Sequence, residues 1–190
     1  MQIDQGHNPR ERRAPRPLDR ARLDELALAY VARFATSAAK LEAYLKRKLR
    51  ERGWDGDGEP AVAALVQRYA DLGYVDDEAY ARTRSGGLLR RGYGPRRVEQ
   101  ALAASGIAEE IRETVRAGAA AERAAALAMA RKRRFGPFGP GVADRAQREK
   151  QFAAMLRAGH ALDSVRELVD AASIEAAEEW AASAEEDYRA

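Results

Sequence analysis

The sequence contains no cysteine among its 190 residues, so it forms neither a disulfide framework nor a thiolate metal site or nucleophile. Histidine is almost as scarce, because His7 and His160 are the only two and lie far apart in the chain. Metal binding and histidine-dependent acid–base catalysis therefore lack their usual residues. His160 directly follows a glycine, and we expect it to pack in a partly buried position. We expect no metal site, no cofactor and no catalytic residue.

Long apolar runs are missing as well, since the longest ones are short, rich in alanine and interrupted by charged residues. A membrane-spanning helix needs about 20 consecutive apolar residues. The N-terminus carries arginine and proline where a signal peptide would carry an apolar segment. We therefore expect a cytoplasmic protein with no membrane span.

Aromatic residues make up only 7% of the chain, whereas hydrophobic residues make up 46% and charged residues 33%, with an excess of alanine. This mixture favours helices at almost every position. The length allows one domain or two small ones. We expect an all-α protein.

The first helical pattern begins at Asp19, a residue type that caps helix starts, and it places one apolar stripe on the helix that follows. Thr36 or Ser37 can start a second, strongly basic helix that ends at Gly53. Pro60 fits the first turn of a third helix. Three helices thus form one unit. The apolar stripe of its first helix consists of Leu23, Leu26, Ala27, Tyr30, Val31 and Phe34.

The same pattern recurs twice, which indicates a repeat. The glycines that stop the second helices, Gly53, Gly106 and Gly159, are 53 residues apart. One unit alone would leave a face uncovered, so stacked units are the economical arrangement. Further helices are expected from Asp76 to about Arg91, from Pro95 to Gly106, and over 108–118, 120–134, 143–158 and 162–172. We predict three tandem three-helix repeats, over residues 19–75, 76–119 and 120–172, in an elongated, curved array that is right-handed or solenoid-like.

The two ends of the chain differ in charge. Residues 1–18 combine arginines with Pro9, Pro15 and Pro17 and have little apolar content, which predicts a disordered basic tail. Residues 173–190 are rich in alanine and glutamate and predict an acidic extension with one more short helix.

Two short motifs resemble chemical sites without meeting their requirements. The carboxylates of Asp76-Asp77-Glu78 diverge around a helix instead of converging on one ion, and acidic residues stabilise a helix start by capping and through the macrodipole. Gly92-Tyr93-Gly94 lacks the preceding strand and the Gly-Lys-Ser/Thr of a phosphate-binding loop. We interpret the first as a helix start and the second as a helix stop before Pro95.

Basic residues gather in three clusters, one in each predicted unit, and the chain carries a net charge of +3. If the units stack in register, the clusters form a discontinuous positive track suited to a helical polyanion or a nucleoprotein filament. The alternative is that they only solvate alanine-rich helices. The clusters are Lys46, Arg47, Lys48 and Arg50; Arg90, Arg91, Arg96 and Arg97; and Arg131, Lys132, Arg133 and Arg134.

Three motifs resemble the RecX family, the regulators of the RecA recombinase. They are Tyr44-Leu45-Lys46-Arg47-Lys48-Leu49 through Gly53-Trp54, Leu72-Gly73-Tyr74-Val75-Asp76-Asp77-Glu78-Ala79-Tyr80-Ala81, and Arg90-Arg91-Gly92-Tyr93-Gly94-Pro95-Arg96-Arg97-Val98. The resemblance covers roughly residues 23–172. It implies three tandem three-helix repeats that bind the RecA filament and restrain its ATPase, strand exchange and coprotease activities in DNA repair, recombination and the SOS response. It implies no catalysis by the protein itself.

The expected partners are therefore the RecA filament and DNA, contacted directly or through RecA, and we expect a monomer. A different function remains open from the residues alone, namely a helical nucleic-acid-binding protein that acts without RecA. No constellation of residues supports an enzyme.

Overall fold

A computed structural model describes residues 16–184. Within that range the chain forms ten α-helices and one short 3-10 turn and has no strand, which confirms the all-α prediction. None of these helices is long and apolar enough to cross a membrane. The helices are α1 (Arg20–Val31), α2 (Ala38–Arg52), α3 (Val62–Asp71), α4 (Asp77–Arg90), α5 (Pro95–Ala103), α6 (Glu109–Thr114), α7 (Ala119–Arg133), α8 (Arg145–Arg157), α9 (Leu162–Val169) and α10 (Ile174–Ser183), with the 3-10 turn η1 over Gly136–Phe138.

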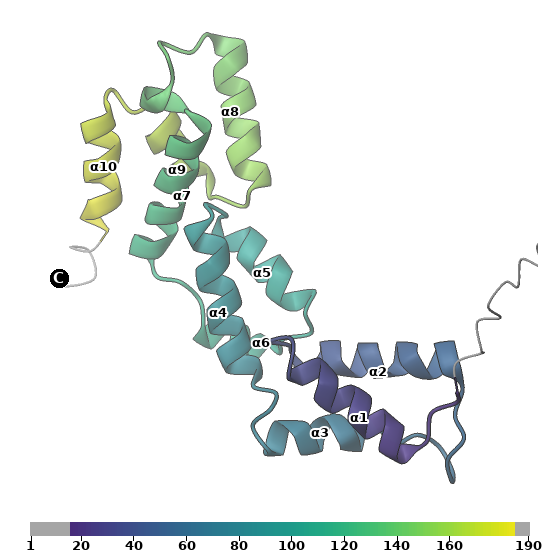
Figure 1. Cartoon of the computed structure of the whole chain (residues 1–190). Coiled ribbons are helices and arrows are strands. Elements are labelled where there is room, and N and C mark those ends of the chain that lie inside the picture. Colours follow the sequence, from purple (N-terminus) through teal and green to yellow (C-terminus); the bar gives the residue numbers. More distant parts are fainter. Residues whose placement is uncertain (1–15, 185–190) are drawn as a thin grey trace, which may run out of the picture.

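The helices lie in three groups along an extended molecule (Figure 1). The N-terminal group, α1–α3, occupies one end, the central group, α4–α6, follows, and the C-terminal group, α7–α10, occupies the other end. The elongated helical array expected from the repeat is thus observed. Where one repeat unit ends and the next begins stays a prediction.

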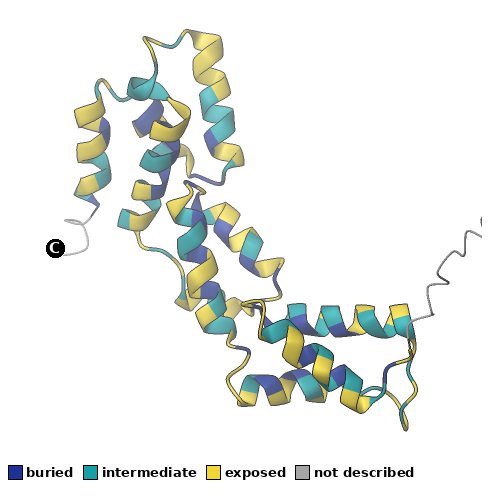
Figure 2. Cartoon of the chain, viewed as in Figure 1, coloured by how far each residue is buried: buried dark blue, intermediate teal, exposed yellow. Residues whose placement is uncertain are grey.

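Each group has its own apolar core. Leu41 and Leu45 of α2 are fully buried in the N-terminal core, Leu102 of α5 in the central core, and Met155 and Leu168 in the C-terminal core. Figure 2 shows the buried residues on the inward faces of the helices. Full burial of a side chain of this size stabilises the fold by about 1.5–3 kcal/mol. Because the cores are separate, the groups are held to one another by smaller junctions.

Short polar side chains cap α1, α2 and α4 at the residues that the sequence predicts. Asp19 accepts a hydrogen bond from the backbone of Arg22, Ser37 starts α2, and Asp76 accepts from the backbone of Ala79. Such caps satisfy backbone N–H groups that have no partner inside the helix. Asp144 caps α8 in the same way.

Glycines end the second helices of the groups. Gly53, Gly106 and Gly159 all have positive φ, at 82°, 71° and 93°. A side chain in this left-handed region clashes with the backbone, so glycine is the favoured residue there. The 53-residue period in the sequence therefore corresponds to one repeated structural feature.

Several predicted boundaries are wrong. Helix α1 ends at Val31, so Phe34 lies beyond it and its side chain is 56% exposed, outside the predicted buried stripe. Helix α3 starts at Val62 after a cap at Ala61, which leaves Pro60 outside its first turn. Helices α6 and α9 are shorter than predicted, since α6 ends at Thr114 and α9 at Val169.

Both predicted tails lie partly outside the described residues. Leu18, the last residue of the predicted N-terminal tail, is fully buried in the N-terminal core. Its N–H donates to the Gly53 carbonyl at 3.0 Å. At the other end, α10 packs on α7, and Trp180 lies against the C-terminal core.

Candidate functional site

The second helices of the groups, α8, α5 and α2, follow one another end to end (Figure 1). The C-terminal end of α8 meets the start of α5, where Gly94 N donates to the Ala158 carbonyl at 2.9 Å and Arg96 N to the Gly159 carbonyl at 3.2 Å. The loop after α5 meets the start of α2, where Ser37 Oγ donates to the Ser105 carbonyl at 2.6 Å. The carbonyl groups that end one helix thus bond to the start of the next.

The junction between the central and C-terminal groups is closed by backbone contacts. A Cβ atom on Gly94 would overlap the carbonyl group of Gly159, and one on Gly159 would overlap the backbone of Arg97. A Cβ atom on Gly92 would lie less close, 3.0 Å from the backbone nitrogen and the Cβ atom of Met129 in α7. At Gly94 and Gly159, no side chain larger than hydrogen fits without moving the helices apart.

His160 lies inside this junction and is only 1% exposed. Its Nε2 atom is 3.0 Å from the Gly92 carbonyl. Burial lowers the pKa of His160, and the hydrogen bond to Gly92 only partly opposes this effect. The packing role expected for this histidine is confirmed, and its burial is more complete than expected.

Four arginines surround the same junction. Arg90 is the last residue of α4, Arg91 follows it, and Arg96 and Arg97 lie in the first turn of α5. All four are exposed, and none forms a salt bridge within residues 16–184. They are therefore available to an anionic partner.

Arg157 belongs to the same surface, although the sequence analysis did not select it. It is the last residue of α8, it is exposed, and the chain two residues later bonds to Arg96. Its only sequence signal is its place just before Gly159. That signal becomes informative only once α8 is known to end against α5.

The basic end of α7 lies beside this junction. Met129, which touches Gly92, is one turn before the cluster of residues 131–134. Arg131 is paired with Glu178 of α10 and lies 5.7 Å from the Phe138 ring. Lys132, Arg133 and Arg134 are exposed and form no salt bridge within the described part of the chain.

The basic cluster on α2 is different in both place and pairing. Lys46 pairs with Glu42 at 2.6 Å, and Lys48 pairs with Glu51 at 2.7 Å. Arg47 is 3.6 Å from Glu51, while Arg50 has no salt bridge within residues 16–184. These residues lie between the middle of α2 and its C-terminal end, away from the other two clusters. The structure thus places two predicted clusters together and the third apart.

The carboxylate run at the start of α4 has structural partners. Asp76 caps the helix, Asp77 accepts from Ala38 N at 2.8 Å, and Glu78 pairs with Arg82 at 2.5 Å. Within residues 16–184 there is no group of three or more metal-ligating side chains. The helix-start interpretation of Asp76-Asp77-Glu78 is confirmed.

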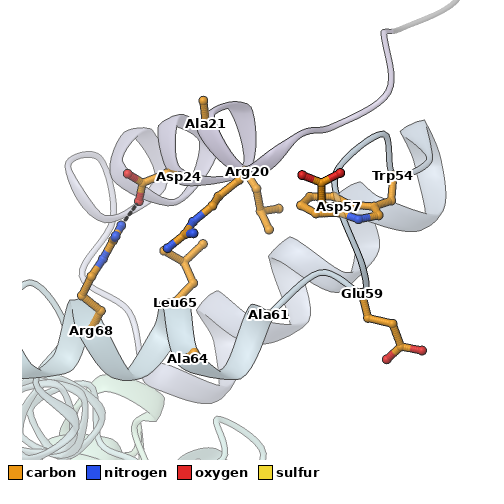
Figure 3. Close-up of a pocket in the computed structure, with 11 residues that line it drawn as sticks. Arg20, Ala21, Asp24, Trp54, Asp57, Glu59, Ala61, Ala64, Leu65 and Arg68 are labelled. Atoms are coloured by element: carbon orange, nitrogen blue, oxygen red, sulfur yellow. Dashed lines mark hydrogen bonds and ion pairs between the residues drawn. The ribbon is translucent and has the colours of Figure 1, made fainter.

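A cavity of about 690 Å³ opens between α1 and α3 near Trp54. Figure 3 shows Arg20 reaching from α1 toward α3, while Asp24 faces its partner Arg68. Burial, followed by the hydrogen bond to Asp24, raises the pKa of nearby Tyr69. The lining of the cavity contains no nucleophile paired with a base, so the cavity is no candidate active site.

Comparisons with known proteins agree with this architecture. Residues 76–115, which span α4, α5 and α6, match a family model described as RecX, second three-helix domain. A regulatory protein RecX from Myxococcus xanthus is 31% identical over 166 residues, covering 82% of this chain and 88% of that protein. A regulatory protein RecX from Mycobacterium sp. (strain KMS) is 36% identical over 128 residues, covering 63% of this chain and 67% of that protein.

Solved structures show the same fold. The crystal structure of RecX from Lactobacillus salivarius aligns with a TM-score of 0.61 at 18% identity, covering 78% of this chain and 93% of that chain. A second crystal structure, of regulatory protein RecX, also gives a TM-score of 0.61, at 19% identity, over 78% of this chain and 70% of that chain. At these identities the likeness concerns the fold alone.

Proposed function

The chain belongs to the RecX family of regulatory proteins, and from this premise we propose that it binds the RecA–DNA filament and restrains its activities. The restrained activities are ATP hydrolysis, strand exchange and coprotease activity, in DNA repair, recombination and the SOS response. The protein itself catalyses no reaction, and it acts in the cytoplasm as a monomer.

The observation that carries this proposal is the group of unpaired arginines at the junction of α4, α5 and α8. Arg90, Arg91, Arg96 and Arg97 are held on two helix ends whose backbone positions are fixed by Gly94 and the α8 carbonyl groups. Fixed cations on an extended scaffold suit a partner that repeats along its own axis and carries negative charge. The α7 cluster enlarges the same surface, and the α2 cluster provides a second contact point.

The test is inhibition of DNA-dependent ATP hydrolysis by the RecA of the same organism. The wild-type protein should slow hydrolysis at substoichiometric to equimolar amounts. A variant with Arg90, Arg91, Arg96 and Arg97 replaced by glutamine should require roughly 10-fold or more protein for the same inhibition, because several charge contacts are lost together. Its unfolding midpoint should hardly change, since these side chains lie on the surface.

A matched control removes the same charge elsewhere. Arg20, Arg82, Arg145 and Arg166 are exposed arginines away from the junction, and the last three form surface ion pairs with Glu78, Glu149 and Asp163. Replacing all four by glutamine removes the same total charge and should leave inhibition nearly unchanged, because exposed ion pairs contribute little. If both quadruple variants inhibit as well as the wild-type protein, the junction arginines only keep the surface solvated and do not contact the filament. An unchanged RecA ATPase rate with wild-type protein at all salt concentrations would reject the proposed function itself.

A second candidate function rests on the same charges. A protein that binds nucleic acid independently of RecA would bind naked DNA or RNA tightly with a steep salt dependence, because counterions are released. It would leave RecA activity unaffected. Measuring both binding to naked DNA and ATPase inhibition over the same range of salt separates the two candidates.

A further inference from the structure

Phe34 is a large apolar side chain that the fold does not account for. It lies three residues beyond the end of α1, and 56% of it is exposed. Its ring touches Tyr30, with centroids 5.4 Å apart, but it is absent from the residues that pack on the N-terminal core. A single exposed apolar ring is common on protein surfaces, so Phe34 suggests a contact surface only together with the side chains around it.

Phe34 ends a row of three aromatic rings. Tyr30 of α1 stacks on Tyr44 of α2, with centroids 4.2 Å apart and planes 19° from parallel. Both tyrosines also pack on the N-terminal core, so their positions are fixed by α1 and α2 together. The row therefore presents the Phe34 ring on a rigid support.

Two arginines complete this surface, which we name the aromatic patch: Tyr30, Arg33, Phe34, Tyr44 and Arg47. They surround a hollow of about 370 Å³ whose lining contains no carboxylate. The Arg47 guanidinium lies 5.5 Å from the Tyr44 ring, and its side chain is 58% exposed. Arg33 is exposed and forms no salt bridge within residues 16–184. The patch thus combines flat apolar faces with positive charge.

We propose that the aromatic patch binds single-stranded nucleic acid, with one unpaired base stacked on Phe34 and the adjoining phosphates on Arg33 and Arg47. Every base has a flat π face, and base–aromatic stacking contributes about 1–3 kcal/mol per base. Tyr30 and Tyr44 are stacked, and the exposed Phe34 ring is tilted 51° from Tyr30, so its own face is not covered by the stack. An uncovered aromatic face with cations beside it suits a chain that alternates bases and phosphates. The inference deepens the proposed function, on which it rests for the presence of DNA, and it is tested without RecA.

An aromatic residue also follows the first helix of each of the other two groups. Tyr93 follows the end of α4, is 38% exposed, and has Arg91 and Arg96 close to it in the chain. Phe135 follows the end of α7 but packs on the C-terminal core. The proposed base contact therefore has a second candidate at Tyr93 and none at Phe135.

The experiment measures fluorescence anisotropy of a labelled oligo(dT) with the full-length protein in the absence of RecA. Phe34→Ala should weaken binding roughly 5- to 100-fold, and Phe34→Leu should weaken it nearly as much, because leucine keeps the apolar character but lacks the flat ring. Arg33→Gln with Arg47→Gln should also weaken binding and reduce the salt slope by about 1.4, because each phosphate contact to a single strand contributes about 0.7.

Two controls separate stacking from other effects. An abasic oligomer of the same length keeps the phosphates but has no bases, so wild type and Phe34→Ala should bind it equally. Leu28→Ala removes another exposed apolar side chain of α1, 49% exposed, and should leave oligo(dT) binding unchanged.

Wild-type affinity of Phe34→Ala for oligo(dT) would overturn the inference. An equal loss on the abasic oligomer would also overturn it, since the effect would then not depend on bases. If Phe34→Ala keeps oligo(dT) binding but loses ATPase inhibition, the patch is a protein-docking surface and the nucleic-acid assignment is wrong, while the proposed function stands.

Discussion

The two junctions of the array occupy equivalent places but are built from different groups. Between the N-terminal and central groups, side chains form the contacts: Ser37 Oγ bonds to the Ser105 carbonyl, and Lys40 Nζ donates to Tyr80 Oη at 2.5 Å. Between the central and C-terminal groups, the backbone forms them, with Gly94 N bonded to the Ala158 carbonyl. One junction can adjust by side-chain movement, whereas the other fixes two helix ends directly.

The electrostatics of the junctions differ in the same sense. Although burial alone would raise it, the pKa of Tyr80 in the first junction is lowered by its hydrogen bonds with Lys40 and Ser105. The Lys40 ammonium group at the first junction is therefore engaged in a hydrogen bond within the protein. In the second junction a neutral histidine and glycines fill the interior, and the arginines remain outside. Rigid, internally neutral packing thus leaves the charges at that site free for a partner.

The largest expected effect comes from adding one methyl group to the backbone junction. Gly94→Ala places a Cβ against the Gly159 carbonyl group, where no flexible side chain can give way. We expect a loss of about 3 kcal/mol in the free energy of unfolding, measured by urea denaturation.

Gly53→Ala is the matched control, because Gly53 also has positive φ but nothing lies within 4 Å of its Cβ position. It should cost about 1 kcal/mol, from backbone strain alone. Equal losses in the two variants would mean that the second junction is no more tightly packed than the C-terminal end of α2 at Gly53.

A smaller and partly reversible effect is expected at the side-chain junction. Gly106→Ala places a Cβ against the Cβ of Ala39, which is itself a removable side chain. Adding Ala39→Gly should therefore recover about half of the lost stability, the remainder being the strain at Gly106 and the flexibility of the new glycine.

The corresponding pair at the other junction should show no recovery. In Gly159→Ala the overlap includes the backbone nitrogen of Arg97, which Arg97→Gly does not remove. Recovery by both pairs, or by neither, would abolish the distinction between the junctions.

The smallest effect is the pH dependence that His160 gives to the backbone junction. Because its pKa is lowered in the folded protein, folding favours the neutral ring, so its contribution is complete above the ordinary pKa of about 6.5 and is lost as pH falls below it. One proton gives a slope of at most about 1.4 kcal/mol per pH unit.

His160→Gln tests this effect, since glutamine can donate to the Gly92 carbonyl but does not titrate in this range. Between about pH 7.5 and about pH 5, the wild-type protein should lose more stability than the variant. Parallel pH profiles would show that protonation of His160 does not act on this junction.

The sequence predicted the features that depend on neighbouring residues. Asp19, Ser37 and Asp76 cap helices through their own backbone, and Gly53 ends one because of its φ angle, so local patterns were sufficient. Phe34 was misplaced because its apolar spacing continued past the end of α1.

Features that depend on distant contacts were missed for a physical reason. Arg157 joins the arginine surface only because α8 ends against the start of α5. Likewise, Leu18 is buried because it bonds to Gly53 and Asp55, more than 30 residues later. Residue types alone do not specify which helix end meets which.

Leu18 also occupies the end of the array at Gly53. Gly53 and Gly159 occupy equivalent positions in the repeat. The Gly159 carbonyl accepts a hydrogen bond from the next helix, whereas the Gly53 carbonyl accepts one from Leu18 N. Asp55 N in turn donates to the Leu18 carbonyl at 2.8 Å. The residues before α1 therefore occupy the position that the next helix occupies at the junction of α8 and α5. A further three-helix unit could not bond to Gly53 in that way unless Leu18 were displaced.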